Sequence, residues 1–442
     1  MLERGGYHQA ERTQGVRAVK PSIVPVNLEI PVDTRPGPLA ALARALLLSR
    51  FSRLRHGEIR IVDGSSEQLC GARSERCPLS VSIEVLSPRF YADAVFGGTV
   101  GAGTAYIRGL WRCSDLTGLA RIMYANRELM DQLDRRWTLF SRPLLRLFHW
   151  LHRNSRDGST RNIVAHYDLG NDFYRLMLDE TMAYSCGIFA SDTTTLAEAS
   201  RAKFDLACRK LALQPGDQLL EIGTGWGGLA MHAARHYGCH VTTTTISRQQ
   251  YDYTREQVAR QGLGDRITLL LEDYRELRGR FQKLVSIEMI EAVGAAYLDT
   301  YLAKCAALLD RSGAMLLQAI TIRDQDYRTA LRSINFIQRY VFPGSFIPSV
   351  SAITDSLRRV TDLKLFHLED IGPHYARTLA SWRRNFFEHL AAVRKLGYSE
   401  AFIRLWEFYL CSCEGGFAER QLGDVQMLLT KPGCRRAVVA AA

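Results

Sequence analysis

The chain has 442 residues, of which 47% are hydrophobic and 23% charged, and this composition is typical of a folded protein with two or three domains. No stretch reaches the roughly 20 apolar residues that span a bilayer, and we expect no secretory signal, because the N-terminus lacks an apolar core. The ten cysteines include no CxxC pair, which argues against a disulfide scaffold or a metal site and favours a reducing cytoplasm.

The net charge of +11 is unevenly distributed along the chain. Residues 1–165 contain 24 Lys and Arg against 15 Asp and Glu, whereas the remaining residues contain 33 against 31. A basic N-terminal third of this kind suits an anionic partner, either a nucleic acid or the acidic face of a membrane.

The N-terminal third is predicted to contain a tail and a small α/β domain. Residues 1–37 are rich in Pro, Gly and charged residues without a sustained period, which is typical of a loose tail. Within residues 38–158, an apolar helical run is followed by alternating segments at 58–62 and 81–86, which predict strands.

The segment 135–156 combines apolar and basic residues at helical spacing. Its apolar residues are Trp137, Phe140, Leu144, Leu147 and Leu151, and six arginines lie around them. This composition favours an interfacial helix that lies on an anionic membrane. A helix packed on its own domain, with its arginines in solvent, explains the pattern equally well.

From about residue 159 onward, segments with the pattern of strands alternate with helical segments. The predicted strands cover residues 218–223, 240–247, 266–271, 282–289 and 313–322, with a late strand near 424–431. This alternation predicts an α/β domain with a parallel, doubly wound sheet over residues 159–442.

The first of these strands runs into the glycine-rich sequence EIGTGWGG at 221–228. A glycine turn at the carboxyl end of a strand lets a ligand approach the backbone and the N-terminus of the next helix. The GxGxxG spacing also fits a nicotinamide enzyme, but no acidic residue closes the second strand to bind a ribose. Glu221 stands two residues before the first glycine, where methyltransferases place a carboxylate, so the pattern favours methyl transfer over hydride transfer.

Two carboxylates follow the fourth strand in the sequence SIEMIEAVG. Catalytic groups in such sheets lie outside the carboxyl ends of the strands. We interpret Glu288 as the end of the strand, and we predict that Glu291, just beyond it and ahead of Gly294, is catalytic. A solvated loop carboxylate is the alternative interpretation of Glu291.

Seven stretches of the chain resemble, in the same order, the family of cyclopropane-fatty-acyl-phospholipid synthases, which includes the mycolic acid cyclopropane synthases. They are HYDLGNDFYRLMLDETMAYSC (166–186), LEIGTGWGG (220–228), TTISRQQ (244–250), EDYREL (272–277), MIEAVG (289–294), RYVFPGSFIPS (339–349) and GPHYARTLASW (372–382). The stretch GTVGAGTAYIRGLWRCSDL (98–116) is similar to the small domain at the start of full-length members. The resemblance implies a class I, Rossmann-like methyltransferase sheet preceded by a smaller α/β domain.

The resemblance also implies a reaction. The alkene of an unsaturated phospholipid acyl chain attacks the methyl group of S-adenosylmethionine, and a carbocation forms. A bound bicarbonate removes a proton, and a cyclopropane ring closes. The expected partner is therefore lipid at the anionic, cytoplasmic face of a membrane and not nucleic acid, and a homodimer is expected because relatives often form one.

The site residues of the family fall on matching positions of this chain. The residues expected to hold bicarbonate are Cys186, Glu291, Gln318 and Tyr375. The residues expected to contact S-adenosylmethionine are His166, Tyr184, Ser185, Glu221, Gly223, Gly225, Thr245, Gln250 and Asp273. No basic residue flanks Cys186 to activate its thiol, so we interpret this cysteine as part of the anion site and not as a nucleophile.

Gln318 departs from the family, which has a histidine at this position. An amide still donates a hydrogen bond to an anion, but it does not titrate near neutral pH. The change leaves open a second product, a methylene or methyl-branched fatty acid, which forms when a neighbouring carbon loses the proton. More distant alternatives are an RNA methyltransferase with a nucleophilic cysteine and a binding protein without activity.

Overall fold

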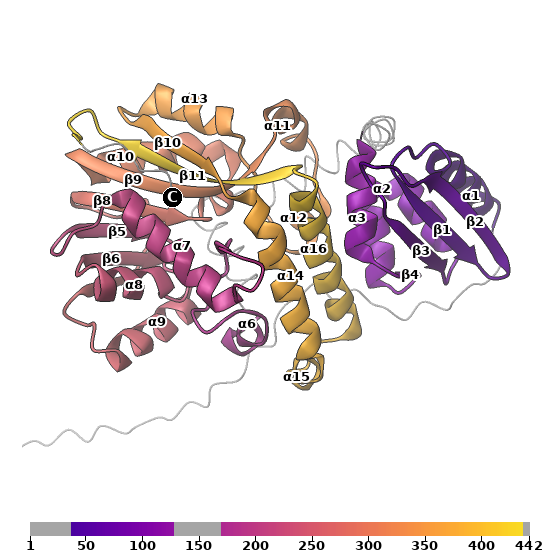
Figure 1. Ribbon diagram of the computed structural model, residues 1–442, viewed down its shortest axis with the longest axis horizontal. Coiled ribbons are helices and arrows are strands. Elements are labelled where there is room, and N and C mark those ends of the chain that lie inside the picture. The colour runs from indigo at the N-terminus through magenta and orange to yellow at the C-terminus, as the bar shows by residue number, and fades with distance from the viewer. Residues whose placement is uncertain (1–36, 128–168, 436–442) are drawn as a thin grey trace, which may run out of the picture.

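The computed structural model describes residues 37–127 and 169–435. Most of the predicted tail, the basic segment at 135–156 and His166 lie outside the described residues, as does the predicted domain boundary near residue 158. The described chain forms two α/β units of different size, with long helices between them (Figure 1).

The smaller unit has a four-stranded sheet in the order β2-β1-β3-β4. Its strands are β1 (Gly57–Asp63), β2 (Ser66–Ala72), β3 (Ser80–Val85) and β4 (Trp111–Cys113), and its helices are α1 (Pro38–Phe51), α2 (Arg89–Ile107) and α3 (Leu116–Ala125). Ile59, Ile61 and Ile83 are buried at alternate positions, as expected for strands with one face in the core. The two strands predicted in this region are therefore confirmed.

The larger unit is built on a seven-stranded sheet in the order β10-β11-β9-β8-β5-β6-β7. Its strands are β5 (Gln218–Ile222), β6 (His240–Thr245), β7 (Ile267–Leu271), β8 (Phe281–Ile287), β9 (Leu309–Ile322), β10 (Lys364–Asp370) and β11 (Leu422–Thr430). The five strands from β9 to β7 are parallel, as predicted. The sheet is nevertheless mixed and not wholly parallel, because β11 is antiparallel to both β9 and β10.

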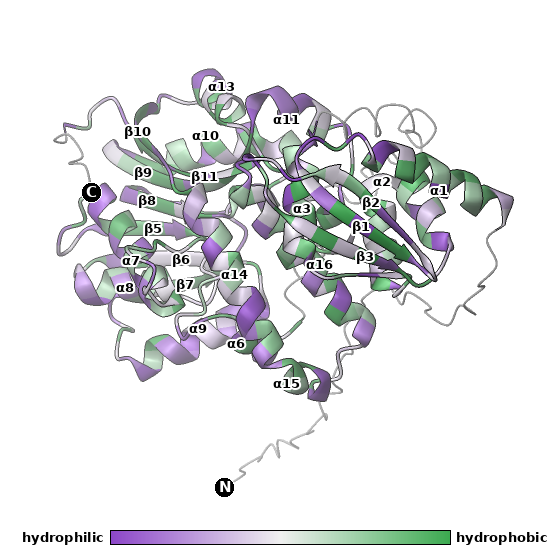
Figure 2. Cartoon of the chain, turned by 45° about the vertical axis from the view of Figure 1, so that its right-hand side comes forward, coloured by the Kyte–Doolittle hydropathy of each residue, from purple (hydrophilic) through white to green (hydrophobic). Residues whose placement is uncertain are grey.

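Helices cover both faces of the large sheet. The helices of the larger unit, which include those on the two faces, are α6 (Asn171–Met177), α7 (Leu196–Leu211), α8 (Gly228–His236), α9 (Arg248–Arg260), α10 (Leu298–Leu308), α11 (Asp324–Ala330), α12 (Phe336–Tyr340), α13 (Val350–Val360), α14 (Gly372–Glu388), α15 (Leu390–Lys395) and α16 (Glu400–Ala418). Leu219 packs in one core with α7, α8 and α9, whereas the adjacent Leu220 packs on the opposite face with α10 and α13. Figure 2 shows the hydrophobic and hydrophilic stripes expected for helices with one buried side.

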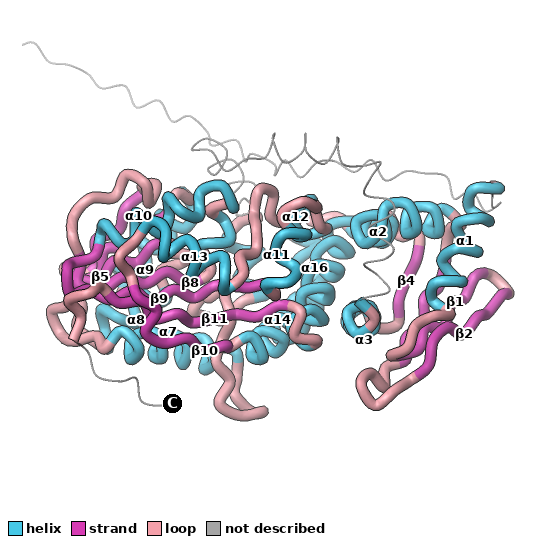
Figure 3. The backbone as a smooth tube through the Cα atoms, turned by 90° about the horizontal axis from the view of Figure 1, so that it is seen from above, coloured by secondary structure: helices cyan, strands magenta, loops and turns pink. Residues whose placement is uncertain are grey.

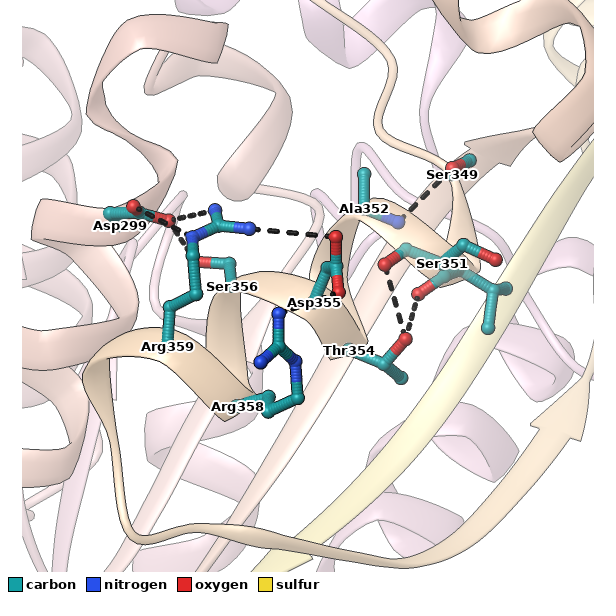
Figure 4. A network of polar contacts seen from close by, with 10 residues as sticks. Asp299, Ser349, Ser351, Ala352, Thr354, Asp355, Ser356, Arg358 and Arg359 are labelled. Atoms are coloured by element: carbon teal, nitrogen blue, oxygen red, sulfur yellow. Dashed lines mark hydrogen bonds and ion pairs between the residues drawn. The ribbon is translucent and has the colours of Figure 1, made fainter.

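A small polar network joins α13 to α10 (Figure 4). Ser349 caps α13 by accepting a hydrogen bond from the backbone N–H of Ala352 at 3.2 Å. Asp299 of α10 accepts hydrogen bonds from Arg359 at 2.7 Å and from Ser356 at 2.5 Å. These bonds hold α13 against the face of the sheet that α10 covers.

The long helices α14 and α16 lie between the two sheets (Figure 3). Arg383 of α14 donates a hydrogen bond to Glu414 of α16 at 2.8 Å, and Arg121 of α3 donates to Glu419 at the end of α16 at 2.8 Å. The smaller unit is thus attached directly to helices that belong to the larger one. In the described part of the chain, no helix is both long enough and apolar enough to cross a bilayer.

Candidate active site

The glycine-rich loop connects the end of β5 to α8. Gly223, Gly225 and Gly227 have positive φ angles of 101°, 53° and 83°, which residues with a Cβ atom rarely adopt. At Gly227, a Cβ atom would lie 2.6 Å from the side chain of Thr254. The loop therefore requires glycine, and it brings the start of α8, at Gly228 and Leu229, to the lining of a cleft.

The loop forms one wall of a cleft at the carboxyl ends of β5, β6, β7 and β8. Eight of the nine predicted cofactor residues line this cleft: Tyr184, Ser185, Glu221, Gly223, Gly225, Thr245, Gln250 and Asp273. The ninth, His166, lies outside the described residues. The cleft is also lined by residues that were not predicted to bind a cofactor, among them Lys203, Trp226, Tyr274, Arg275 and Glu288.

Glu221 is a buried carboxyl group on the floor of the cleft. Its Oε2 accepts a hydrogen bond from the hydroxyl of Thr243 at 2.5 Å, and that hydroxyl lies 2.7 Å from the hydroxyl of Thr224. Burial raises the pKa of Glu221 to about 8, against the lowering effects of Thr243 and of the Lys203 charge. A cation that entered the cleft beside Glu221 would therefore favour loss of its proton.

Neighbouring side chains orient the other polar residues predicted to bind the cofactor. Thr245 donates a hydrogen bond to Oε1 of Gln250 at 2.8 Å. Arg275 donates to both carboxylate oxygens of Asp273, through Nε at 2.8 Å and Nη2 at 2.7 Å. These bonds pre-organise the side chains at the ends of β6 and β7.

Lys203 of α7 brings a buried amino group to the same cleft. The residue is 1% exposed, and its Nζ donates a hydrogen bond to the hydroxyl of Ser185 at 2.5 Å. Burial lowers the pKa of Lys203, whereas nearby acidic groups, with Glu288 first among them, raise it. The sequence did not indicate that Lys203 lies in the cleft, because a lysine on an amphipathic helix is normally solvated.

Glu288 also lines the cleft, and it accepts hydrogen bonds from three of the residues predicted to hold an anion. Its Oε1 accepts from the backbone N–H of Cys186 at 2.8 Å and from Nε2 of Gln318 at 2.7 Å. Its Oε2 accepts from the hydroxyl of Tyr375 at 2.5 Å. Glu288 is therefore more than the end of a strand, because the predicted anion holders converge on its carboxylate.

Glu291, the carboxylate predicted to be catalytic, lies in the 3-10 turn Ile290–Ala292 after β8. Its Oε1 accepts a hydrogen bond from the backbone N–H of Ile320 at 2.5 Å, and its Oε2 is buried without a hydrogen-bond partner. Burial and the charge of Glu288 raise the pKa of Glu291 to about 8. Among the described residues no hydrogen bond joins Glu291 to the other predicted anion holders, and its catalytic role stays a prediction.

Buried polar groups extend from Glu288 into the sheet. Gln318 of β9 also donates a hydrogen bond to Oδ2 of Asp424 at 3.1 Å, and its Oε1 accepts one from Gln426 at 2.9 Å. Lys210 of α7 donates to Gln426 at 2.7 Å. Asp424 and Gln426 were not among the predicted site residues, although two polar residues at alternate positions of an apolar strand were an available signal.

The thiol of Cys186 is buried away from solvent. Its Sγ lies 3.4 Å from the backbone oxygen of Gly187 and 3.7 Å from that of Ile371. Burial, reinforced by the charges of Asp424 and Glu288, raises the pKa of Cys186 well above its usual value. A thiol of this kind is a poor nucleophile, and the group of Cys186 that reaches Glu288 is its backbone N–H.

Known proteins are similar to this chain over most of its length. The family model described as mycolic acid cyclopropane synthetase matches residues 154–427. The tuberculostearic acid methyltransferase UfaA1 of Mycobacterium tuberculosis is 36% identical, over 90% of this chain and 93% of that protein. The cyclopropane-fatty-acyl-phospholipid synthase of Escherichia coli (strain K12) is 34% identical, over 79% of this chain and 87% of that protein. The mycolic acid cyclopropane synthase CmaA1, solved in a complex with SAH and CTAB, is 32% identical with a TM-score of 0.58, and the match covers 62% of this chain and 98% of that chain.

Proposed function

The chain belongs to the mycolic acid cyclopropane synthetase family, and we propose that it transfers the methyl group of S-adenosylmethionine to the double bond of an unsaturated acyl chain in phospholipid. It is an S-adenosylmethionine-dependent methyltransferase that acts on lipid. We also place the substrate at the anionic, cytoplasmic face of a membrane, because residues 1–165 carry most of the excess positive charge. The observation that carries the proposed methyl transfer is the cleft that the predicted cofactor residues share with Glu288.

The chemistry of an alkene substrate suits this cleft. An alkene has no proton for a base to remove before it attacks, so the protein must position the two reactants, exclude water and stabilise positive charge. Tyr184 and Trp226 line the cleft and can present ring faces to a cation. Both rings are held by aromatic neighbours, Tyr184 by Trp382 and Trp226 by Tyr174, with ring centroids 4.9 Å apart in each pair.

Bicarbonate, the proton acceptor that the family resemblance implies, does not fit the observed contacts. The donors expected to hold it, from Cys186, Gln318 and Tyr375, are bonded to the carboxylate of Glu288. We therefore include no step through bicarbonate in the proposed reaction.

Two products remain candidates, and they differ in how the carbocation is resolved. Loss of a proton from the transferred methyl group with closure of a ring gives a cyclopropane. Loss of the proton on the carbon that bears the new methyl group gives a methyl-branched alkene, and a 1,2-hydride shift followed by loss of a proton from the methyl group gives a methylene chain. Two observations favour the second product. The Gln318 amide is bonded to the carboxylate of Glu288, and a relative named as a tuberculostearic acid methyltransferase matches 90% of this chain.

Proton NMR of the product tests the proposal and separates the two outcomes. The purified chain is incubated with S-adenosylmethionine and vesicles that contain anionic lipid and a monounsaturated acyl chain, and the fatty acids are then released. Mass does not suffice, because a ring and an exocyclic methylene add the same CH2. High-field ring protons identify a cyclopropane, and vinylidene protons identify a methylene product. A vinylic methyl group next to a single vinyl proton identifies a methyl-branched alkene. Absence of all three signals under any buffer condition would refute the proposed reaction.

Binding of S-adenosylmethionine near neutral pH is expected to release a proton from Glu221. Its pKa of about 8 without ligand keeps much of the carboxyl group protonated at pH 7, and a bound cation favours the ionised form. Affinity should therefore increase as the pH rises toward 8 and level off above it. Calorimetry at pH 7 in phosphate and in Tris, which differ in ionisation enthalpy, should give different apparent binding enthalpies. The buffer difference should disappear in Glu221→Gln, and its persistence would assign the proton to another group.

A further inference from the structure

The carboxylate of Glu288 occupies the position in which three hydrogen-bond donors were expected to hold an external anion. We propose that Glu288 itself accepts the proton that the acyl carbocation loses, so that the reaction needs no bound bicarbonate. This inference rests on the proposed methyl transfer and adds the identity of the base.

The position of Glu288 suits such a role. Glu288 lines the cleft together with Glu221 and Gly223, on the side where the methyl donor is expected. Its partners Cys186 and Gln318 are fully buried and are not among the residues that line the cleft. Of the groups in this cluster, Glu288 is therefore the one that a substrate in the cleft can reach.

The backbone at Glu288 supports a specific function. Its φ angle is 47°, in the left-handed region that residues with a Cβ atom rarely adopt. Its N–H donates to the backbone oxygen of Gln318 at 2.9 Å, so the turn is held in place. Strained backbone that the surrounding structure maintains occurs preferentially at functional sites. A glycine would adopt this φ angle without strain, but the chain has a glutamate at this position.

The orientation of the Gln318 amide is determined by its neighbours. Gln426 donates to Oε1 of Gln318 and receives a hydrogen bond from Lys210, which has no acceptor to offer. The NH2 group of Gln318 must therefore face Glu288 and Asp424. In this orientation the Gln318 amide presents only N–H donors to Glu288. The carboxylate of Glu288 accepts a hydrogen bond from this amide and from the other two donors, the Cys186 backbone and the Tyr375 hydroxyl.

Asp424 is a positioning residue in this arrangement. It is completely buried, and burial together with the charge of Glu288 raises the pKa of Asp424 well above its usual value, which favours its neutral form. A neutral carboxyl group at Asp424 does not repel a carboxylate at Glu288. The buried amino group of Lys203 lies on the side of α7, and its interaction with Glu288 opposes the lowering of the Lys203 pKa by burial.

The proposed step balances without a further reactant. The alkene forms a bond to the methyl carbon, S-adenosylhomocysteine leaves with the electrons of the broken C–S bond, and the acyl chain becomes a cation. A C–H bond then breaks, its electrons form the new C–C bond or double bond, and the proton moves to Glu288. Glu288 returns this proton to water after the product leaves.

The test uses the full-length chain with S-adenosylmethionine and monounsaturated phospholipid vesicles. The wild type is expected to keep its rate in CO2-free buffer, and added bicarbonate should not increase it. Glu288→Gln keeps the size of the side chain but not the base, and it is expected to lower kcat about 100-fold or more. Calorimetric affinity for S-adenosylmethionine should remain unchanged, which separates loss of the base from loss of the fold.

Glu288→Gly provides a rescue experiment. Glycine suits the positive φ angle, and removal of the side chain leaves the three donors free for a small anion. Added formate should therefore restore part of the lost rate. Arg420→Gly is the matched control, because Arg420 also has a positive φ angle, of 54°, and does not line the cleft. Its activity should equal that of the wild type with or without formate.

Two results would overturn the assignment of the base while leaving methyl transfer intact. One is a wild-type rate that falls to background when bicarbonate is removed, and the other is a Glu288→Gln variant as active as the wild type. Absence of any product from the wild type, with or without bicarbonate, would instead refute the methyl transfer itself and the base with it.

Discussion

Replacement of Gln318 by leucine is expected to lower kcat by about two orders of magnitude and to destabilise the fold by about 2–4 kcal/mol. Gln318 is completely buried, and its amide contacts Glu288, Asp424 and Gln426. Leucine has a similar volume but no donor or acceptor, so the partly buried Glu288 and the fully buried Asp424 and Gln426 would each lose a partner. Transfer of labelled methyl to lipid measures the first effect, and urea denaturation measures the second.

Gln318→His separates the catalytic from the structural part of this effect. A neutral imidazole has one donor and one acceptor, so it can replace the bonds to Glu288 and Gln426 but not the bond to Asp424. Intermediate activity is therefore expected, without a requirement for bicarbonate. If Gln318→Leu lost stability but kept the wild-type kcat, the amide would have a structural role alone.

Replacement of Tyr375 by phenylalanine is expected to lower kcat about 10- to 100-fold with little change in folding, because it removes one hydrogen bond to a charged group. The hydroxyl of Tyr375 donates to Oε2 of Glu288 at 2.5 Å. The ring stacks on Phe417 with centroids 4.4 Å apart, and phenylalanine preserves this packing. Steady-state kinetics and thermal denaturation measure the two quantities.

The control for this variant is Tyr301→Phe. Tyr301 is completely buried in α10 and does not line the cleft, so the loss of its hydroxyl should leave kcat unchanged. The KM for S-adenosylmethionine should be the same in both variants and in the wild type. A higher KM with an unchanged kcat in Tyr375→Phe would assign the hydroxyl to cofactor binding and not to the support of Glu288.

Local patterns in the sequence were sufficient for the parallel strands and the cofactor cleft. Strands β5 to β9 follow the predicted order because buried parallel strands read as short apolar runs between helices. The glycine loop and the polar residues after β6 and β7 meet in one cleft because the carboxyl ends of parallel strands share one edge of the sheet. Eight of the cofactor residues that the family resemblance implied line this cleft.

The choice between two carboxylates depended on the tertiary structure. Glu288 and Glu291 follow the same strand three residues apart, and either could have met the predicted anion holders. The left-handed turn at Glu288 directs its side chain to those residues, whereas Glu291 turns to the backbone of Ile320. The spacing of residues along the chain does not predict this difference. The positive φ angle of Glu288 is maintained by contacts with residues that are distant in the sequence, such as Gln318.

The sequence by itself therefore determined which residues lie at the carboxyl edge of the parallel sheet, since that placement follows from local periodicity and the geometry of parallel strands. Only the tertiary structure decided which polar groups bond to one another there. The late strand β11 inserts antiparallel beside β9, with Gln426 opposite Gln318, and this register brings Asp424 to the same cluster. The register between strands that are distant in the sequence decides which side chains form hydrogen bonds with one another. Hydrophobic periodicity within one strand does not specify which distant strand pairs with it.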